Sequence, residues 1–192
     1  ALEDLKLVCD AYIEELSKDY QSVTIGQFIF QRDLRNDGSL GVSSVRGIAT
    51  SKEFINTKAD MEGVGLNNYK VVAPGQFAYV PDTSRRGDKI GIALLEDDEE
   101  GLVSNVYTVF EIIDEKQLIP EYLMLWFSRP EFDRYARFKS HGSVREVMDW
   151  DEMCKVELPV PPYEKQKEIV DGYKAITERI ALKQKINDNL AA

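Results

Sequence analysis

The stretch VELPVPPYEKQKEIV, residues 156–170, joins two parts of the chain that have different sequence patterns. The segment CKVELPV, residues 154–160, is typical of a short strand. Pro161 and Pro162 then end that strand, because proline has no amide hydrogen to donate to a sheet, and proline is favoured in the first turn of a helix. We therefore expect a strand that leads directly into a long C-terminal helix.

The same prolines raise the question of catalysis, since adenine methyltransferases hold their target base with a Pro-Pro-Tyr turn. In those enzymes an Asn or Asp before the prolines accepts a hydrogen bond from the exocyclic amine, whereas here the position is Val160. A methyl-donor site would also need a glycine-rich turn after an early strand, and the glycine-dense residues 63–65 follow no convincing strand. Neither requirement is met, which argues against a methyltransferase.

Apolar residues recur at helical spacing near both termini, with charged residues on the other faces. The C-terminal set is Ile169, Tyr173, Ile176 and Ile180, continued by Lys183 and Asn187 and closed by Leu190. The N-terminal set is Leu2, Leu5, Cys9, Tyr12 and Leu16. Seams this narrow favour two helices packed as an antiparallel coiled coil, or packed on a partner chain. The alternative is two ordinary surface helices on one core.

The region between these helices predicts a mixed body. Strands are expected at residues 23–30, 45–50, 90–95 and 102–113, with two more around the turn in YKVVAPGQFAYVP. Short helices are expected from Pro120 and from Pro130, with Phe132, Tyr135 and Phe138 on one face and mostly in the core. The predicted fold is α/β (α+β), with an N-terminal helix at residues 1–20, a globular body at 21–160 and a spacer or dimerisation helix at 161–192.

Composition narrows the class of protein. The 192 residues are 43% hydrophobic, which is typical of a folded globular chain. There is no apolar run of the length that a membrane span needs, and the acidic start has no signal-peptide core. The two cysteines, Cys9 and Cys154, lack the spacing of a zinc site and suit a reducing cytoplasm. We expect a cytoplasmic protein with no cofactor or metal of its own.

The charge is unevenly distributed. A net charge of −10 argues against nucleic-acid binding when taken alone. However, cations gather in TSRRGDK, residues 83–89, and in RFKSHGSVRE, residues 137–146, where Arg can bond guanine and Lys or Ser can bond phosphate. The candidate DNA contacts are Arg85, Arg86, Lys89, Lys139, His141, Ser143 and Arg145. The acidic run at residues 96–100 is expected to face away from phosphate, and local ion pairing remains the simpler alternative.

Two further catalytic functions are suggested by short patterns in the sequence. Asp82, Asp114 and Lys116 follow the spacing of metal-dependent nucleases, in which carboxylates and a lysine hold Mg²⁺ and orient water. The match is short, and 34 acidic residues make chance matches easy. The only histidine, His141, has no identifiable acid partner for a triad. No catalytic residue is therefore predicted.

The opening stretch, followed by ITERIALKQKINDNL at residues 176–190, resembles the junction between target recognition domain and spacer helix in specificity subunits of type I restriction–modification systems. PGQFAYVPDTSRRGDKIGIALL, VSNVYTVFEI, PEYLMLWFSRPEFDRYARFKSHGSVRE and DWDEMCKVELPVP also resemble that family's recognition domain, in the expected order. The resemblance covers roughly residues 23–190. Its most specific parts are the Pro-x-Pro-Pro…Gln element and the Gly-Ser…Arg loop.

The resemblance implies a non-catalytic subunit that recognises one half of an interrupted double-stranded DNA target. It would dock methyltransferase subunits, which bring S-adenosylmethionine and flip the adenine, and restriction or translocase subunits that use ATP and Mg²⁺, in a bacterial or archaeal cytoplasm. Members usually carry two recognition domains, whereas this chain has one and ends within a helical pattern, as a half-length form or fragment would. A half-length form would dimerise through its helices, with Ile169, Tyr173, Ile176, Ile180 and Leu190 as the interface. A helix-mediated regulator without DNA contact is the further alternative.

Overall fold

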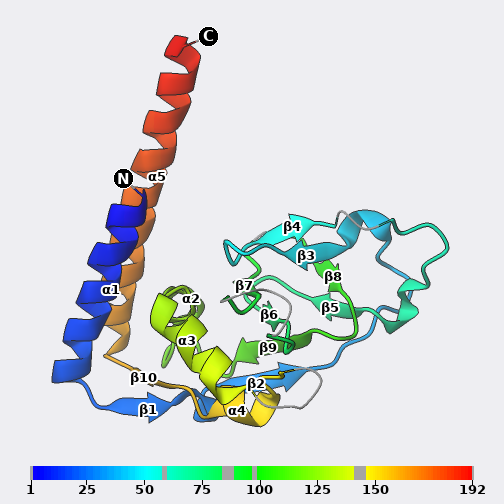
Figure 1. Cartoon of the computed structure of the whole chain (residues 1–192), viewed down its shortest axis with the longest axis horizontal. Helices are drawn as coiled ribbons and strands as arrows, with labels where there is room; N and C mark the ends of the chain where they lie inside the picture. Colours follow the sequence, from blue (N-terminus) through cyan, green and yellow to red (C-terminus); the bar gives the residue numbers. More distant parts are fainter. Residues whose placement is uncertain (1, 58–59, 84–88, 97–98, 141–145, 192) are drawn as a thin grey trace.

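The computed structural model describes residues 2–57, 60–83, 89–96, 99–140 and 146–191 of the chain. Two long helices, α1 (Leu2–Asp19) and α5 (Tyr163–Ala191), lie side by side at one edge of a body of strands and short helices (Figure 1). The predicted mixed α/β class, with a long C-terminal helix beside an N-terminal one, is confirmed.

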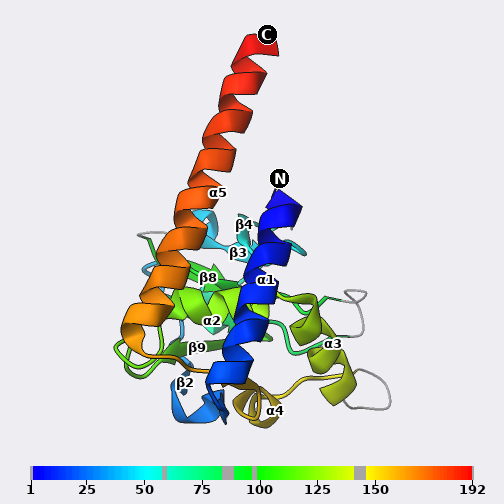
Figure 2. The ribbon, with the colours of Figure 1, turned by 90° about the vertical axis from the view of Figure 1, so that its left-hand side faces the viewer.

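A two-stranded ribbon sets the direction of both long helices. β1 (Ser22–Thr24) directly follows α1, β10 (Glu157–Pro159) directly precedes α5, and the two strands pair antiparallel with Ser22 opposite Pro159. The helices that leave this ribbon therefore run antiparallel, as Figures 1 and 2 show. Contacts between them include the Lys165 ammonium 5.3 Å from the centre of the Tyr12 ring. α5 has 29 residues and α1 has 18, and the C-terminal part of α5 extends beyond α1 (Figure 1).

The body contains four small sheets in the described part of the chain. The largest has the order β2-β9-β6-β7, all antiparallel, formed by β2 (Ile29–Arg32), β9 (Thr108–Ile112), β6 (Phe77–Tyr79) and β7 (Ile92–Leu94). β5 (Lys70–Val72) pairs with β8 (Gly101–Val103), and β3 (Arg46–Ile48) pairs with β4 (Phe54–Asn56). The turn before β6 contains Gly75 with φ of 81°, a conformation that favours glycine.

The main core lies between the four-stranded sheet and the helices. Phe77 and Phe110 stack with ring centres 4.8 Å apart, and Phe127 meets both rings edge-on. Leu16 of α1 and Ile169 and Val170 of α5 belong to the same buried cluster. The terminal helices are thus packed against the body rather than attached only by the chain.

α2 (Pro120–Phe127) and α3 (Pro130–Lys139) begin at the prolines that the sequence indicates. α4 (Trp150–Cys154) was not predicted; the Asp149 side chain caps it by accepting a hydrogen bond of 2.9 Å from the Glu152 amide. The expectation that the α3 aromatics are mostly core holds for Phe132 but is wrong for Phe138. Phe132 is 3% exposed, whereas the Phe138 side chain is 83% exposed.

Two strands predicted as continuous are interrupted. Residues 25–27 form a 3₁₀ turn between β1 and β2, where Gly26 packs so closely that a Cβ atom would lie 2.8 Å from that of Cys154. Residues 104–107 form a turn between β8 and β9, in which the Tyr107 amide donates to the Ser104 carbonyl at 3.0 Å. Within the described residues, none of the helices is long and apolar enough to span a membrane.

Candidate nucleic-acid interface

The first predicted DNA-binding segment begins beside both ends of the second. The Thr83 hydroxyl lies 2.8 Å from Ser140 Oγ, and the Thr83 amide donates to the Glu146 carbonyl at 3.0 Å. The Met148 amide donates to the Pro81 carbonyl at 3.0 Å. Residues 81–83 lead into the first segment. Residue 140 lies near the start of the second segment, and residues 146–148 lie at its end. The structure therefore brings together segments that are more than fifty residues apart in sequence.

The far end of the first segment is held by a buried ion pair. The Ile90 amide donates to Asp133 Oδ1 of α3 at 3.1 Å, and Lys52 Nζ lies 2.8 Å from the same oxygen. Lys52 also donates to the Phe127 carbonyl. Both charged side chains are buried, with 5% and 10% exposed. Burial of a charge is tolerated when it is paired and hydrogen-bonded. The pair fixes the β3–β4 turn against α3, and the Ile90 bond fixes the residues before β7 against the same helix.

Of the seven predicted DNA contacts, the structure describes Lys89 and Lys139. Lys89 is exposed at the end of the first segment. Lys139, in the last turn of α3, is half-buried, with its ammonium 5.7 Å from the centre of the Tyr135 ring. Arg85, Arg86, His141, Ser143 and Arg145 lie outside the described residues.

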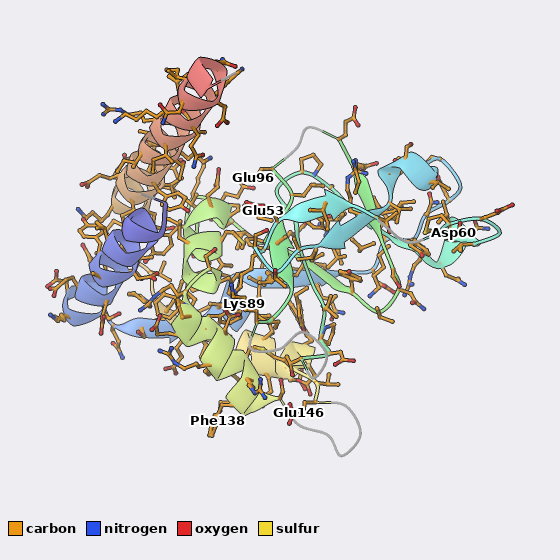
Figure 3. All side chains as sticks on the ribbon, turned by 45° about the horizontal axis from the view of Figure 1, so that its top comes forward. Glu53, Asp60, Lys89, Glu96, Phe138 and Glu146 are labelled. Atoms are coloured by element: carbon orange, nitrogen blue, oxygen red, sulfur yellow. The ribbon has the colours of Figure 1, made fainter. Side chains whose placement is uncertain are left out.

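Other surfaces of the body are less suited to phosphate. Glu96 lies with Glu53 at the opposite end of the body from Phe138 and Glu146 (Figure 3). Both line a groove of about 400 Å³ between α2, α5 and the β3–β4 turn, together with Glu121. A second groove, of about 620 Å³, lies beside α3 and carries both signs of charge. There the buried Arg129 stacks 4.7 Å over Trp126 and lies 3.6 Å from carboxylates of Asp10 and Glu131.

The nuclease alternative is wrong, because its residues are not brought together. Asp82 follows the end of β6, which pairs with the start of β9, whereas Asp114 follows the end of β9. With about 3.3 Å per strand residue, the five residues of β9 separate the two carboxylates by roughly 15 Å or more. Asp114 instead accepts hydrogen bonds from the Gln117 side chain and from the Lys116 amide, which lower its pKa. The described residues contain no group of side chains that could hold a metal ion.

The Pro-x-Pro-Pro…Gln element forms a rigid joint between the body and α5. Gln166 is fully buried; its side-chain oxygen accepts from the Ile119 amide at 2.8 Å, and its side-chain nitrogen donates to the carbonyls of Gln117 and Pro161, both at 2.8 Å. The Tyr122 hydroxyl donates to the Pro159 carbonyl at 2.9 Å. The direction of α5 is therefore fixed by buried hydrogen bonds and not by a flexible hinge.

The predicted partner-binding residues of α5 are not equally accessible. Ile169 is 7% exposed and belongs to the core of its own chain, so it offers no surface to a partner. Tyr173 and Ile180 are half-buried and line the groove beside α2. Ile176 is 45% exposed, and the Leu190 side chain lies outside the described residues. The predicted seam omits Leu182 and Ile186, which are 59% and 48% exposed.

Comparison with known families identifies this arrangement. Residues 48–192 match the family described as "Type I restriction modification DNA specificity domain". The chain belongs to this family. The specificity domain is a DNA-recognition unit and not a catalytic one. No curated protein matches its sequence significantly.

Solved structures show the same fold. The HsdS subunit from Thermoanaerobacter tengcongensis matches with a TM-score of 0.56 and 13% identity, over 97% of this chain and 46% of that one. The S subunit of a type I restriction–modification system from M. genitalium matches with a TM-score of 0.55 and 10% identity, over 99% of this chain and 49% of that one. A structure describing assembly of the type I R-M system matches with a TM-score of 0.55 and 15% identity, over 99% of this chain and 48% of that one. The specificity domain thus spans about half the length of the subunits it matches.

Proposed function

We propose that the specificity domain recognises one half of an interrupted double-stranded DNA target through residues 83–89 and 139–146. The observation that carries this proposal is that the first segment starts beside both ends of the second, where Thr83 contacts Ser140 and Glu146. A protein of net charge −10 needs a local basic surface to bind phosphate. Segments that hold Arg85, Arg86, Lys89, Lys139 and Arg145 and begin side by side can supply one.

The proposal includes the division of labour along the chain. Residues 21–160 recognise bases. Residues 1–20 and 161–192 set the distance between recognition surfaces and recruit a methyltransferase subunit, and a restriction or translocase subunit joins that complex. S-adenosylmethionine, ATP and Mg²⁺ belong to those subunits, which act on DNA in the cytoplasm of a bacterial or archaeal cell. Two chains join through their helices, with Ile176, Leu182 and Ile186 as the exposed apolar residues available for this contact.

The double change Arg85→Ala/Arg86→Ala tests the DNA-binding surface. We expect duplex affinity at physiological salt to fall at least tenfold, since one base-specific arginine contributes about 1–3 kcal/mol, with an unchanged melting temperature. Fluorescence anisotropy with a labelled duplex measures the affinity.

The control is Lys18→Ala/Lys116→Ala, which removes the same charge from exposed positions elsewhere. Equal affinities of the Arg85/Arg86 variant and wild type would contradict the proposal. The regulator alternative, which the net charge favours, predicts capture of a methyltransferase subunit without any DNA affinity. Incubation with plasmid and Mg²⁺ is expected to give no cleavage.

A further inference from the structure

The outer face of α3 is an amphipathic surface that the function above does not use. Arg134, Arg137 and Phe138 are all exposed, and Arg134 lies three residues before Arg137 and four before Phe138. Arg134 also donates to Glu131 Oε1 of the preceding turn at 2.7 Å. On the inner side of the same helix, Phe132 and Ala136 are buried. Phe138 is the most exposed of the large apolar side chains in the described part of the chain, at 83%. It projects from the end of α3, away from the body (Figure 3).

This face of α3 ends where the two DNA-binding segments begin. Ser140, the residue after α3, contacts Thr83 at 2.8 Å, and Phe138 lies two residues before it. The last turn of α3 also carries Arg137 and Lys139. Phe138 is therefore exposed to solvent between two cationic residues and beside the proposed DNA surface. This combination suits a polyanionic ligand that also presents apolar groups.

We propose that Phe138 is a specificity-determining residue that contacts the 5-methyl group of a thymine in the DNA major groove, while Arg134 and Arg137 contact phosphate. The inference rests on the proposed function. A helix with its side chains is about 10–12 Å across, which fits the major groove at about 12 Å but not the minor groove at about 6 Å. A phenyl ring forms no hydrogen bonds to base edges, and the thymine methyl is the apolar group exposed in the major groove.

The test compares three proteins by selection from a pool of duplexes with a randomised central segment: wild type, Phe138→Ala and Ile113→Ala. Ile113 is a matched control because it is also a large apolar side chain, 62% exposed, at the far end of β9. We expect wild type and Ile113→Ala to enrich the same motif. Phe138→Ala is expected to lose the thymine preference at one position and to keep the others, with an unchanged melting temperature.

A chemical change in the DNA then isolates the methyl group. Deoxyuridine in place of that thymine is expected to weaken wild-type binding about fourfold, the factor for burial of one methyl group. It should leave the affinity of Phe138→Ala unchanged.

The inference is overturned if Phe138→Ala enriches the full wild-type motif, or if deoxyuridine does not weaken wild-type binding. Retention of the full motif with loss of methyltransferase-subunit binding would assign Phe138 to a protein interface instead. If the wild-type protein enriched no motif, the proposed function would fail as well, so the two failures are distinguishable.

Discussion

At the scale of single residues, Gln166 has the clearest structural role in the joint between body and spacer. A glutamine side chain has one acceptor and one donor group, and here both are used: the oxygen by the Ile119 amide and the nitrogen by two backbone carbonyls. These partners lie on both sides of the joint, because residues 117–119 precede α2 and Pro161 precedes α5. A buried, fully bonded side chain of this kind specifies a single arrangement.

Replacing Gln166 with leucine should therefore be costly. The substitution removes three hydrogen bonds and leaves their backbone partners buried without replacement, at about 1–3 kcal/mol for each unsatisfied group. We expect the free energy of unfolding to fall by about 3 kcal/mol or more, measured by urea denaturation. The same change at Gln184, exposed on the same helix, should alter it by less than about 0.5 kcal/mol. Similar effects of the two substitutions would show that the joint does not depend on Gln166.

The buried pair Lys52–Asp133 illustrates what the sequence alone does not reveal. No sequence pattern assigns either residue a role, and their sequence separation gives no reason to pair them. The role follows only from the fold, which places the β3–β4 turn against α2 and α3. Sequence patterns did locate the cation-rich segments and the Pro-x-Pro-Pro…Gln element, because these are local in the chain. The exposure of Phe138 was not predicted, because the spacing of Phe132, Tyr135 and Phe138 places all three on one helical face. The last turn of α3 nevertheless lies at the surface of the body.

At the scale of elements, the antiparallel arrangement of α1 and α5 follows from the β1–β10 ribbon. Helical spacing predicted both helices and their pairing, whereas the ribbon that directs them depends on strand contacts across more than 130 residues. The interruptions at residues 25–27 and 104–107 likewise depend on tertiary packing, such as the close contact of Gly26 with Cys154. Such contacts leave no periodic signal in the sequence.

The C-terminal part of α5 is the element on which the assembly prediction rests. Residues 181–189 are all exposed, and Leu182 and Ile186 are one helical turn apart. Exposed apolar side chains on a projecting helix are typical of a surface that pairs with another chain.

The double change Leu182→Glu/Ile186→Glu should convert the proposed dimer into monomers at micromolar concentration. Charged side chains buried in an apolar interface destabilise it strongly, while exposed positions leave the monomer fold unchanged. Sedimentation velocity measures the mass. Gln184→Glu/Asn187→Glu, which changes the net charge by the same amount at exposed positions on the opposite face of α5, should remain dimeric. A wild-type protein that is monomeric, alone and with a methyltransferase subunit, would contradict the dimer proposal.

At the scale of the whole molecule, the charges and the shape support the same division of labour. The cation-bearing segments begin at one end of the body, and Glu53 and Glu96 lie at the other (Figure 3). α5 leaves the body through a fixed joint and extends beyond α1 (Figure 1). Its 29 residues span about 43 Å at ~1.5 Å per residue, which is close to one turn of DNA at about 34–36 Å.

A rigid joint and a rigid helix would make the distance between two recognition surfaces a fixed property of the proposed dimer. Two chains related by a twofold axis would present identical surfaces to two inverted half-sites. A flexible connection would instead tolerate many separations of those half-sites.

The most direct measurement is therefore the affinity of the wild-type protein for duplexes that carry two inverted copies of the selected half-site, with the gap between them varied one base pair at a time. We predict one sharp maximum at a gap near a helical turn, with affinity falling as the gap departs from it. Affinity that does not depend on the gap would contradict the account.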